Sequence, residues 1–312
     1  MRYYAYSDYL KSKYGEKVYK LPVNLPVSCP NRIGGKGCAF CAGVGTGFEA
    51  MSSDNSVTEQ LLRTKEHIAK RYHAKKYIAY FQNYTNTFLP VHQFEQYLLE
   101  ASRVEDVVEI SVSTRPDCLT KEYLDVMNKI HKETGIDMNI ELGLQTVNYH
   151  TLDLINRGHG LAEFIDAVLK IKEYNDFTIC THVILNLPGD SMRDIQETAR
   201  ILTALQIDIV KLHSLYIAKD TDLATWYLEN KIEICSKEEY IERVIEFLEL
   251  IPSSMVVERL FSRVPEKDAI FSNWGTSWWK LKDELEAAME MRNSSQGRKC
   301  TYLNGAALNK LR

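Results

Sequence analysis

The sequence predicts an α/β protein whose parallel strands curl into a partial barrel of six β/α units, followed by a short helical C-terminal extension. Three observations support this class. Short apolar runs rich in β-branched and aromatic residues alternate with helical segments along most of the chain. The polar residues of interest cluster near the C-terminal ends of the strands, where such folds place their sites. No internal repeat or low-complexity tract indicates another architecture.

Six strands and five intervening helices are expected in alternation. The strands are predicted at residues 17–25, 77–81, 107–113, 138–144, 177–187 and 207–217. The helices between them are predicted at residues 58–75, 91–100, 121–134, 162–174 and 191–205. Connections between parallel strands are overwhelmingly right-handed, so the units should wind in one direction.

The chain is expected to have three parts. Residues 1–20 form an N-terminal extension, residues 21–251 the barrel, and residues 252–312 the helical C-terminal extension. This last part differs in composition, with a predicted helix near residues 280–291 and a basic end. It also holds three of the four tryptophans: Trp274, Trp278 and Trp279.

Composition limits the classes of partner. The 312 residues are 45% hydrophobic and 26% charged, as in an ordinary globular protein, and the formal net charge is −4. An RNA substrate would therefore need a local basic patch, for which residues 65–76 and 298–312 are candidates. For residues 65–76, the alternative interpretation is the solvated face of a helix. We expect a cytoplasmic protein without a membrane partner, since no apolar run reaches the length of a membrane span.

The seven cysteines are unevenly spaced. Cys29, Cys38 and Cys41 form a C-x8-C-x2-C pattern directly after the first predicted strand, whereas the other four are far apart. Three thiolates can bind three irons of a 4Fe–4S cluster and leave the fourth iron open. The alternative is zinc, but a structural zinc site normally has four protein ligands, and the nearest histidine is His67. Phe40 lies beside the third cysteine, where its ring could stack on an adenine.

Beyond the cysteines, the chain resembles radical S-adenosylmethionine (SAM) enzymes, and YhcC-type proteins in particular. The resemblance rests on CPNR, STRPDCL, ELGLQT, NRGH and LPG, among other segments. TRPD, ELGLQ, NRGH and LPG are also similar to the radical SAM domain of the Elongator catalytic subunit, which modifies the wobble uridine of tRNA. Most members of the superfamily have C-x3-C-x2-C, so the longer first spacer is interpreted as a loop insertion that leaves cluster binding intact.

The resemblance implies two cofactors, a 4Fe–4S cluster and SAM. SAM would chelate the open iron, and one electron from a donor such as flavodoxin or ferredoxin would cleave it to methionine and a 5′-deoxyadenosyl radical. The cofactors supply this chemistry, and the protein supplies orientation and exclusion of water.

The resemblance also implies the SAM contacts. The turn after the second strand would hold the methionine amino group, and a guanidinium would grip the carboxylate. The family's glutamate on the third strand is matched here by Ser111, so either Ser113 or Arg115 is proposed to replace that contact. The complete set of expected cofactor contacts is Phe40, Asn83, Tyr84, Thr85, Ser113, Gln145, Arg157, His182 and Ile184.

The predicted function is radical SAM modification of tRNA, at the C5 side chain of the wobble uridine. No acetyltransferase segment is recognised, so trimming or remodelling of an existing side chain is expected. A small metabolite or a lipid precursor is the alternative substrate, and a structural or redox-sensing metal site is the non-enzymatic alternative. No general acid or base is predicted, and Cys118 and Cys180 are first interpreted as small buried side chains.

Overall fold

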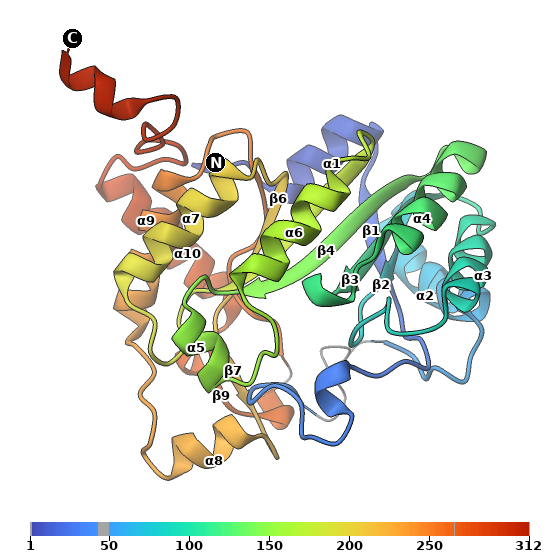
Figure 1. Ribbon diagram of the computed structural model, residues 1–312, viewed down its shortest axis with the longest axis horizontal. Coiled ribbons are helices and arrows are strands. Elements are labelled where there is room, and N and C mark those ends of the chain that lie inside the picture. The colour runs from blue at the N-terminus through green and yellow to red at the C-terminus, as the bar shows by residue number, and fades with distance from the viewer. Residues whose placement is uncertain (1, 43–49, 265, 312) are drawn as a thin grey trace. The chain divides into compact units, whose positions relative to one another are not determined.

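The computed structural model describes residues 2–42, 50–264 and 266–311. Helices and strands alternate along most of the chain (Figure 1). The larger sheet has the strand order β1-β2-β3-β4-β5-β6-β8, and a second sheet pairs β7 with β9. Nearly every neighbour in the larger sheet is also the next strand in sequence, as repeated β/α units produce.

The strands are β1 (Val18–Val23), β2 (Lys76–Phe81), β3 (Val107–Thr114), β4 (Asp137–Gln145), β5 (Phe177–Ile184), β6 (Ile209–His213), β7 (Tyr216–Ala218), β8 (Val256–Arg259) and β9 (Ala269–Ser272). The α-helices are α1 (Tyr6–Tyr14), α2 (Val57–Tyr72), α3 (Val91–Ser102), α4 (Lys121–Thr134), α5 (Tyr149–Leu154), α6 (Leu161–Ile171), α7 (Met192–Ala204), α8 (Asp222–Leu228), α9 (Lys237–Leu250) and α10 (Trp278–Met291).

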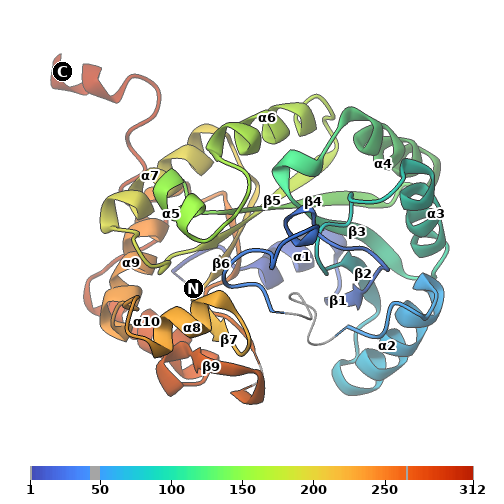
Figure 2. The same ribbon diagram turned by 60° about the horizontal axis from the view of Figure 1, so that its bottom comes forward.

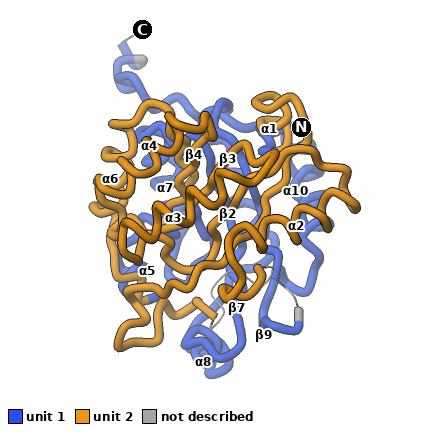
Figure 3. The backbone as a smooth tube through the Cα atoms, turned by 90° about the vertical axis from the view of Figure 1, so that its right-hand side faces the viewer, with its two compact units in different colours: residues 1–6, 145–155, 182–312 blue, residues 7–144, 156–181 orange. Residues whose placement is uncertain are grey.

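The chain divides into two compact units (Figure 3). Unit 2 comprises residues 7–144 and 156–181, and unit 1 comprises residues 1–6, 145–155 and 182–312. Unit 2 therefore contains the cysteine triplet and the first four strands apart from the last residue of β4. Unit 1 contains the end of β5 and the remaining strands.

Within unit 2, strands β1 to β4 pair in parallel, and α2, α3 and α4 lie on their outer side (Figure 2). Side chains alternate between the two faces of a strand. One face is apolar and buried, with Leu21, Val23, Ala79, Phe81, Ile110, Val112, Met138 and Ile140 in register. The other carries polar side chains, among them Lys20, Tyr80, Glu109, Ser111, Ser113, Asn139 and Glu141. The interiors of barrels are usually filled with bulky branched side chains, so a polar face on this sheet differs from the usual pattern.

Local signals set the helix ends in unit 2. The Ser56 hydroxyl accepts a hydrogen bond from the Glu59 N–H at 3.2 Å and begins α2. Helix α4 ends at Gly135, whose φ of +72° is left-handed and favours glycine.

Within unit 1, the buried Arg243 of α9 ties down the segment that follows β5. Its guanidinium donates to the backbone oxygens of Leu185 and Asp190, each at 3.0 Å. These bonds satisfy carbonyl groups that would otherwise be buried without a partner. They fix the turn that contains the LPG motif. The first residues of the chain also belong here, since Ala5 bridges to Val257 of β8.

The predicted alternation of strands and helices is confirmed, and the predicted range 121–134 coincides with α4. The single strand expected at 207–217 is instead two strands, β6 and β7, which Ser214 and Leu215 separate. The segment 252–312, expected to be helical, contains α10 but also β8, which joins the larger sheet, and β9. The boundaries expected at residues 20 and 251 stay predictions. Within the described parts of the chain, no helix has both the length and the apolar character needed to span a bilayer.

Candidate cluster and cofactor site

The three cysteines of the triplet share one tightly turned loop. Cys29 precedes a short 3-10 helix (Pro30–Arg32), and its carbonyl accepts from the Arg32 N–H at 2.8 Å. Cys38 and Cys41 bracket a turn, because the Cys41 N–H donates to the Cys38 carbonyl at 2.9 Å. All three are free thiols. The turns at both ends bring the cysteines into one loop although eight residues separate the first two.

Each sulfur of the triplet has a different arginine beside it. Arg115 Nη1 lies 3.8 Å from Cys29 Sγ, Arg157 Nη1 lies 3.7 Å from Cys38 Sγ, and Arg32 Nη2 lies 3.4 Å from Cys41 Sγ. Burial raises the pKa of the Cys41 thiol, and the Arg32 guanidinium opposes that rise. At Cys41, the Arg32 charge thus favours the thiolate, which is the form of cysteine that binds metal.

Two of these arginines are held in place by other groups of unit 2. Arg115 forms a bidentate pair with Asp117, with Nε to Oδ1 at 2.9 Å and Nη2 to Oδ2 at 2.6 Å. Burial disfavours the Arg115 charge, but Asp117 outweighs it, so the pKa of Arg115 lies above its ordinary value. Arg157 donates from Nη2 to the Gly143 carbonyl at 2.7 Å. Their orientation toward the sulfurs is therefore fixed independently of the sulfurs.

Asn31 connects the cysteine loop to the segment after α5. Its Nδ2 lies 2.7 Å from the Asn156 carbonyl, 2.8 Å from the Arg157 carbonyl and 3.5 Å from Cys38 Sγ. In return, Asn156 Nδ2 donates to the Gly37 carbonyl at 2.8 Å. Gly158 has φ +76°, and a Cβ added there would lie 2.3 Å from Asn31 Oδ1. The CPNR and NRGH motifs are thus interlocked, and the interlock requires glycine at this position.

The donor set fits an iron–sulfur cluster better than a zinc ion. The triplet supplies three free thiols, which as thiolates can bind three irons of a cluster and leave the fourth iron open. A structural zinc site normally takes four protein ligands.

The turn after β2 offers unpaired oxygen acceptors. Asn83 and Thr85 are both buried, and Asn83 Oδ1 and Thr85 Oγ1 have no hydrogen-bond partner among the residues that the structure describes. Buried polar atoms are rarely left unsatisfied, so a missing group that donates hydrogen bonds is indicated. An ammonium group, with three donors, matches two acceptors on one turn. Tyr84, between them, has φ +55°, and its ring lies 5.5 Å from the Arg32 guanidinium.

Ser113 takes part in a hydrogen-bond chain on the polar face of the sheet. Its hydroxyl lies 3.1 Å from Tyr80 OH and 3.5 Å from Glu141 Oε2. Glu141 in turn pairs with Lys20, with Oε1 and Nζ 2.6 Å apart. Ser111 is engaged elsewhere, since it donates to Glu109 Oε1 at 3.0 Å. Sequence reasoning missed Lys20, Tyr80 and Glu141. For Lys20 and Glu141, a charged residue within an otherwise apolar strand was a usable signal.

The remaining predicted cofactor contacts are Gln145, His182, Ile184 and Phe40. Gln145 ends β4 with φ +76°, an uncommon conformation for a residue other than glycine. His182 of β5 has its ring 5.4 Å from that of His213, and Ile184 is buried. These residues lie in unit 1, whereas the half-exposed Phe40 belongs to unit 2 with the cysteines. Their assignment to SAM stays a prediction.

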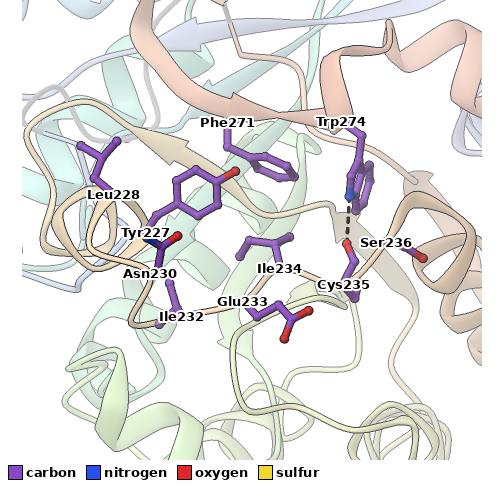
Figure 4. Close-up of a pocket in the computed structure, with 10 residues that line it drawn as sticks. All are labelled: Tyr227, Leu228, Asn230, Ile232, Glu233, Ile234, Cys235, Ser236, Phe271 and Trp274. Atoms are coloured by element: carbon purple, nitrogen blue, oxygen red, sulfur yellow. Dashed lines mark hydrogen bonds between the residues drawn. The ribbon is translucent and has the colours of Figure 1, made fainter.

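Unit 1 also contains an open hollow of about 560 Å³ between α8, β9 and the segment leading to α9 (Figure 4). Tyr227, Phe271 and Trp274 form its aromatic side, and Trp274 Nε1 donates to the Cys235 carbonyl at 2.8 Å. Glu233 supplies a carboxylate. None of the predicted cofactor contacts lines this hollow, and its carboxylate does not suit a phosphate.

The pH dependence of stability is expected to report on His159, which follows the arginine in NRGH. Burial and, to a smaller extent, the neighbouring Arg157 charge together lower the pKa of His159 to about 4. The imidazole therefore stays neutral when folded but takes a proton near pH 6.5 when unfolded. Its contribution is complete above pH 6.5 and is lost as the pH falls toward 4, by about 3 kcal/mol. Urea unfolding between pH 7.5 and pH 4.5 should show a shallower fall for His159→Gln than for the wild type; equal slopes would contradict the assignment.

Comparisons with known proteins agree with this geometry. The family model for the radical SAM superfamily matches residues 23–202, and the model for the radical SAM C-terminal domain matches residues 207–291. Protein YhcC of Escherichia coli is 30% identical over 280 residues, covering 89% of each chain. The tRNA-2-methylthio-N(6)-dimethylallyladenosine synthase of Wolinella succinogenes is 25% identical over 238 residues, covering 74% of this chain and 52% of the synthase.

A solved structure shows the same fold. The archaeal Elp3 of Methanocaldococcus infernus, with its N-terminus deleted, superposes with a TM-score of 0.68 at 17% identity. The match covers 89% of this chain and 64% of the archaeal one. The predicted partial-barrel α/β class is therefore confirmed.

Proposed function

Because this chain belongs to the radical SAM superfamily, we propose that it modifies tRNA, at the C5 side chain of the wobble uridine, with its cluster on Cys29, Cys38 and Cys41. The enzyme uses a 4Fe–4S cluster and SAM and takes its electron from a donor, for which flavodoxin or ferredoxin is proposed. When bound, these cofactors supply one-electron chemistry that activates a C–H bond of the substrate.

The observation that carries the proposal is the convergence of Elongator-like motifs on the cysteine loop. TRPD supplies Arg115, which lies beside Cys29, and NRGH supplies Arg157, which lies beside Cys38. ELGLQ supplies the Gly143 carbonyl that orients Arg157. Segments far apart in the sequence that share a resemblance thus share one place in unit 2. The tRNA synthase among the relatives supports tRNA as the substrate class.

The residues of the chain have separate tasks in this proposal. The three cysteines hold the cluster, while Asn83 Oδ1 and Thr85 Oγ1 accept hydrogen bonds from the SAM ammonium group. The buried Nε of Arg157, which has no hydrogen-bond partner in the described part of the chain, is available to the SAM carboxylate. Ser113, Gln145, His182, Ile184 and Phe40 are proposed to complete the contacts to the ribose and the adenine.

The charge distribution favours a second candidate, a small-molecule substrate. Of the two candidate basic patches, residues 65–76 hold Lys65 paired with Asp106 and Lys70 paired with Glu66. In residues 298–312, Lys299 pairs with Glu246 and Glu249. Each of these lysines already has a carboxylate partner, so fewer unneutralised cations remain in the two segments to contact phosphates. Binding of tRNA should therefore depend only modestly on salt.

Mass spectrometry of tRNA nucleosides, with and without the gene, tests the substrate. We expect one wobble-uridine nucleoside to disappear and its precursor to accumulate in the deletion strain. The wild-type gene and Cys300→Ala should restore it, whereas Cys38→Ala should not. An unchanged nucleoside profile would exclude tRNA in favour of the small-molecule candidate and would leave family membership unaffected.

A further inference from the structure

Three permanent cations surround the cysteine triplet, one for each sulfur. Arg32 belongs to the cysteine loop, Arg115 follows β3, and Arg157 follows α5. A guanidinium does not lose its proton in proteins, so these charges are constant across the working pH range. Three separate segments of unit 2 thus each direct one positive charge at a different sulfur.

Two of these cations are shielded from solvent. The Arg115 side chain is 3% exposed, and Arg157 is 7% exposed. Charges in such surroundings act on their neighbours with less screening by water and salt than surface charges do. The two arginines differ, however, in whether a contacting carboxylate balances their positive charge. Arg115 is paired with the Asp117 carboxylate, whereas the Arg157 guanidinium contacts the Gly143 carbonyl and Cys38 Sγ, which bring no carboxylate to it.

We infer that Arg157 and Arg115 are positioning residues that set the reduction potential of the cluster, with Arg157 contributing more. Net charge and hydrogen bonds to the sulfurs are two of the levers by which proteins tune such clusters. The reduced cluster carries one more electron than the oxidised one, so a nearby cation stabilises the reduced form more. The arginines therefore shift the potential upward, toward values that a biological donor can reach. This inference rests on the cysteine assignment proposed above and not on the identity of the substrate.

The test is a redox titration of the anaerobically reconstituted protein without SAM, followed by electron paramagnetic resonance. Arg157→Gln is expected to lower the ratio of reduced to oxidised cluster at a fixed potential about tenfold, which equals 59 mV for a one-electron couple. Arg115→Gln should shift it less, because Asp117 already offsets that charge. Arg157→Lys, which keeps the charge, should recover most of the difference. The exposed Arg103 provides the matched control Arg103→Gln, which should leave the potential unchanged.

Iron content is measured on every variant, because it distinguishes a change in the reduction potential of the cluster from a loss of the cluster. Equal midpoint potentials for wild type, Arg157→Gln and Arg115→Gln at full iron content would overturn the inference. It would also be overturned if both glutamine variants failed to hold iron, since the cations would then serve cluster binding. Failure of the cysteine assignment gives a different result, namely full iron content in Cys38→Ser. Failure of the tRNA proposal appears only in the nucleoside profile.

Discussion

Replacing Cys38 with serine is expected to abolish the cluster. Cys38 is buried, its sulfur lies within reach of both Asn31 and Arg157, and a serine hydroxyl does not replace the thiolate that such clusters require. Iron, acid-labile sulfide and the visible absorption of the reconstituted protein should all fall to background. Chemical analysis of iron and sulfide on anaerobically purified protein measures this directly.

A distant cysteine supplies the control for this substitution. Cys300 is half-buried near the C-terminus and is not part of the triplet, so Cys300→Ser should keep the iron and sulfide content of the wild type. Cys29→Ser and Cys41→Ser should behave like Cys38→Ser. Wild-type iron content in Cys38→Ser would show that the cluster is held elsewhere.

Replacing Gly158 with alanine is expected to damage the site through sterics alone. A Cβ at this position would lie 2.3 Å from Asn31 Oδ1 and 3.1 Å from Arg115 Nη2. The new methyl group must therefore push Asn31 away from the Arg157 carbonyl and Cys38, and it must displace the arginine beside Cys29. We expect a large loss of bound iron together with a lower midpoint of urea unfolding.

Gly135→Ala is the matched control for this effect. Gly135 has φ +72°, close to the +76° of Gly158, but a Cβ there would have no neighbour within 4 Å. Both variants carry the backbone cost of a left-handed alanine, about 1–2 kcal/mol. Only Gly158→Ala carries the clash as well. If the two variants lost equal stability and both kept their iron, the interlock between CPNR and NRGH would not support the site.

The fold was largely predictable, because β-rich runs and helical segments of ordinary length alternate along the chain. Helix α4 is an example, since its apolar spacing indicates the helix and the following Gly135 marks its C-terminal end. Strand β8 was not predictable as a member of the sheet. Its four residues are two valines followed by Glu258 and Arg259, a run too short and too polar to indicate a strand, and only pairing with β6 makes them one. Long-range partners of this kind are absent from local patterns.

The site was also predictable only in part, because local patterns do not contain its long-range contacts. The spacing of the cysteines singled out the loop, and the resemblance singled out Arg157. Neither indicated that Arg32 would turn back toward Cys41, nor that Asn31 would bond to carbonyls more than 120 residues away. Those contacts depend on tertiary placement, as does the pairing of Lys20 with Glu141 across the sheet.

Cleavage of SAM by the purified protein tests the central claim most directly. Anaerobically reconstituted wild-type protein, supplied with dithionite and SAM, is incubated beside Cys38→Ser and Cys300→Ser, and 5′-deoxyadenosine and methionine are quantified by liquid chromatography. The cysteine loop around Cys38 predicts formation of both products by the wild type and by Cys300→Ser, and none above background by Cys38→Ser. Equal product from wild type and Cys38→Ser would contradict the assignment of SAM cleavage to this loop.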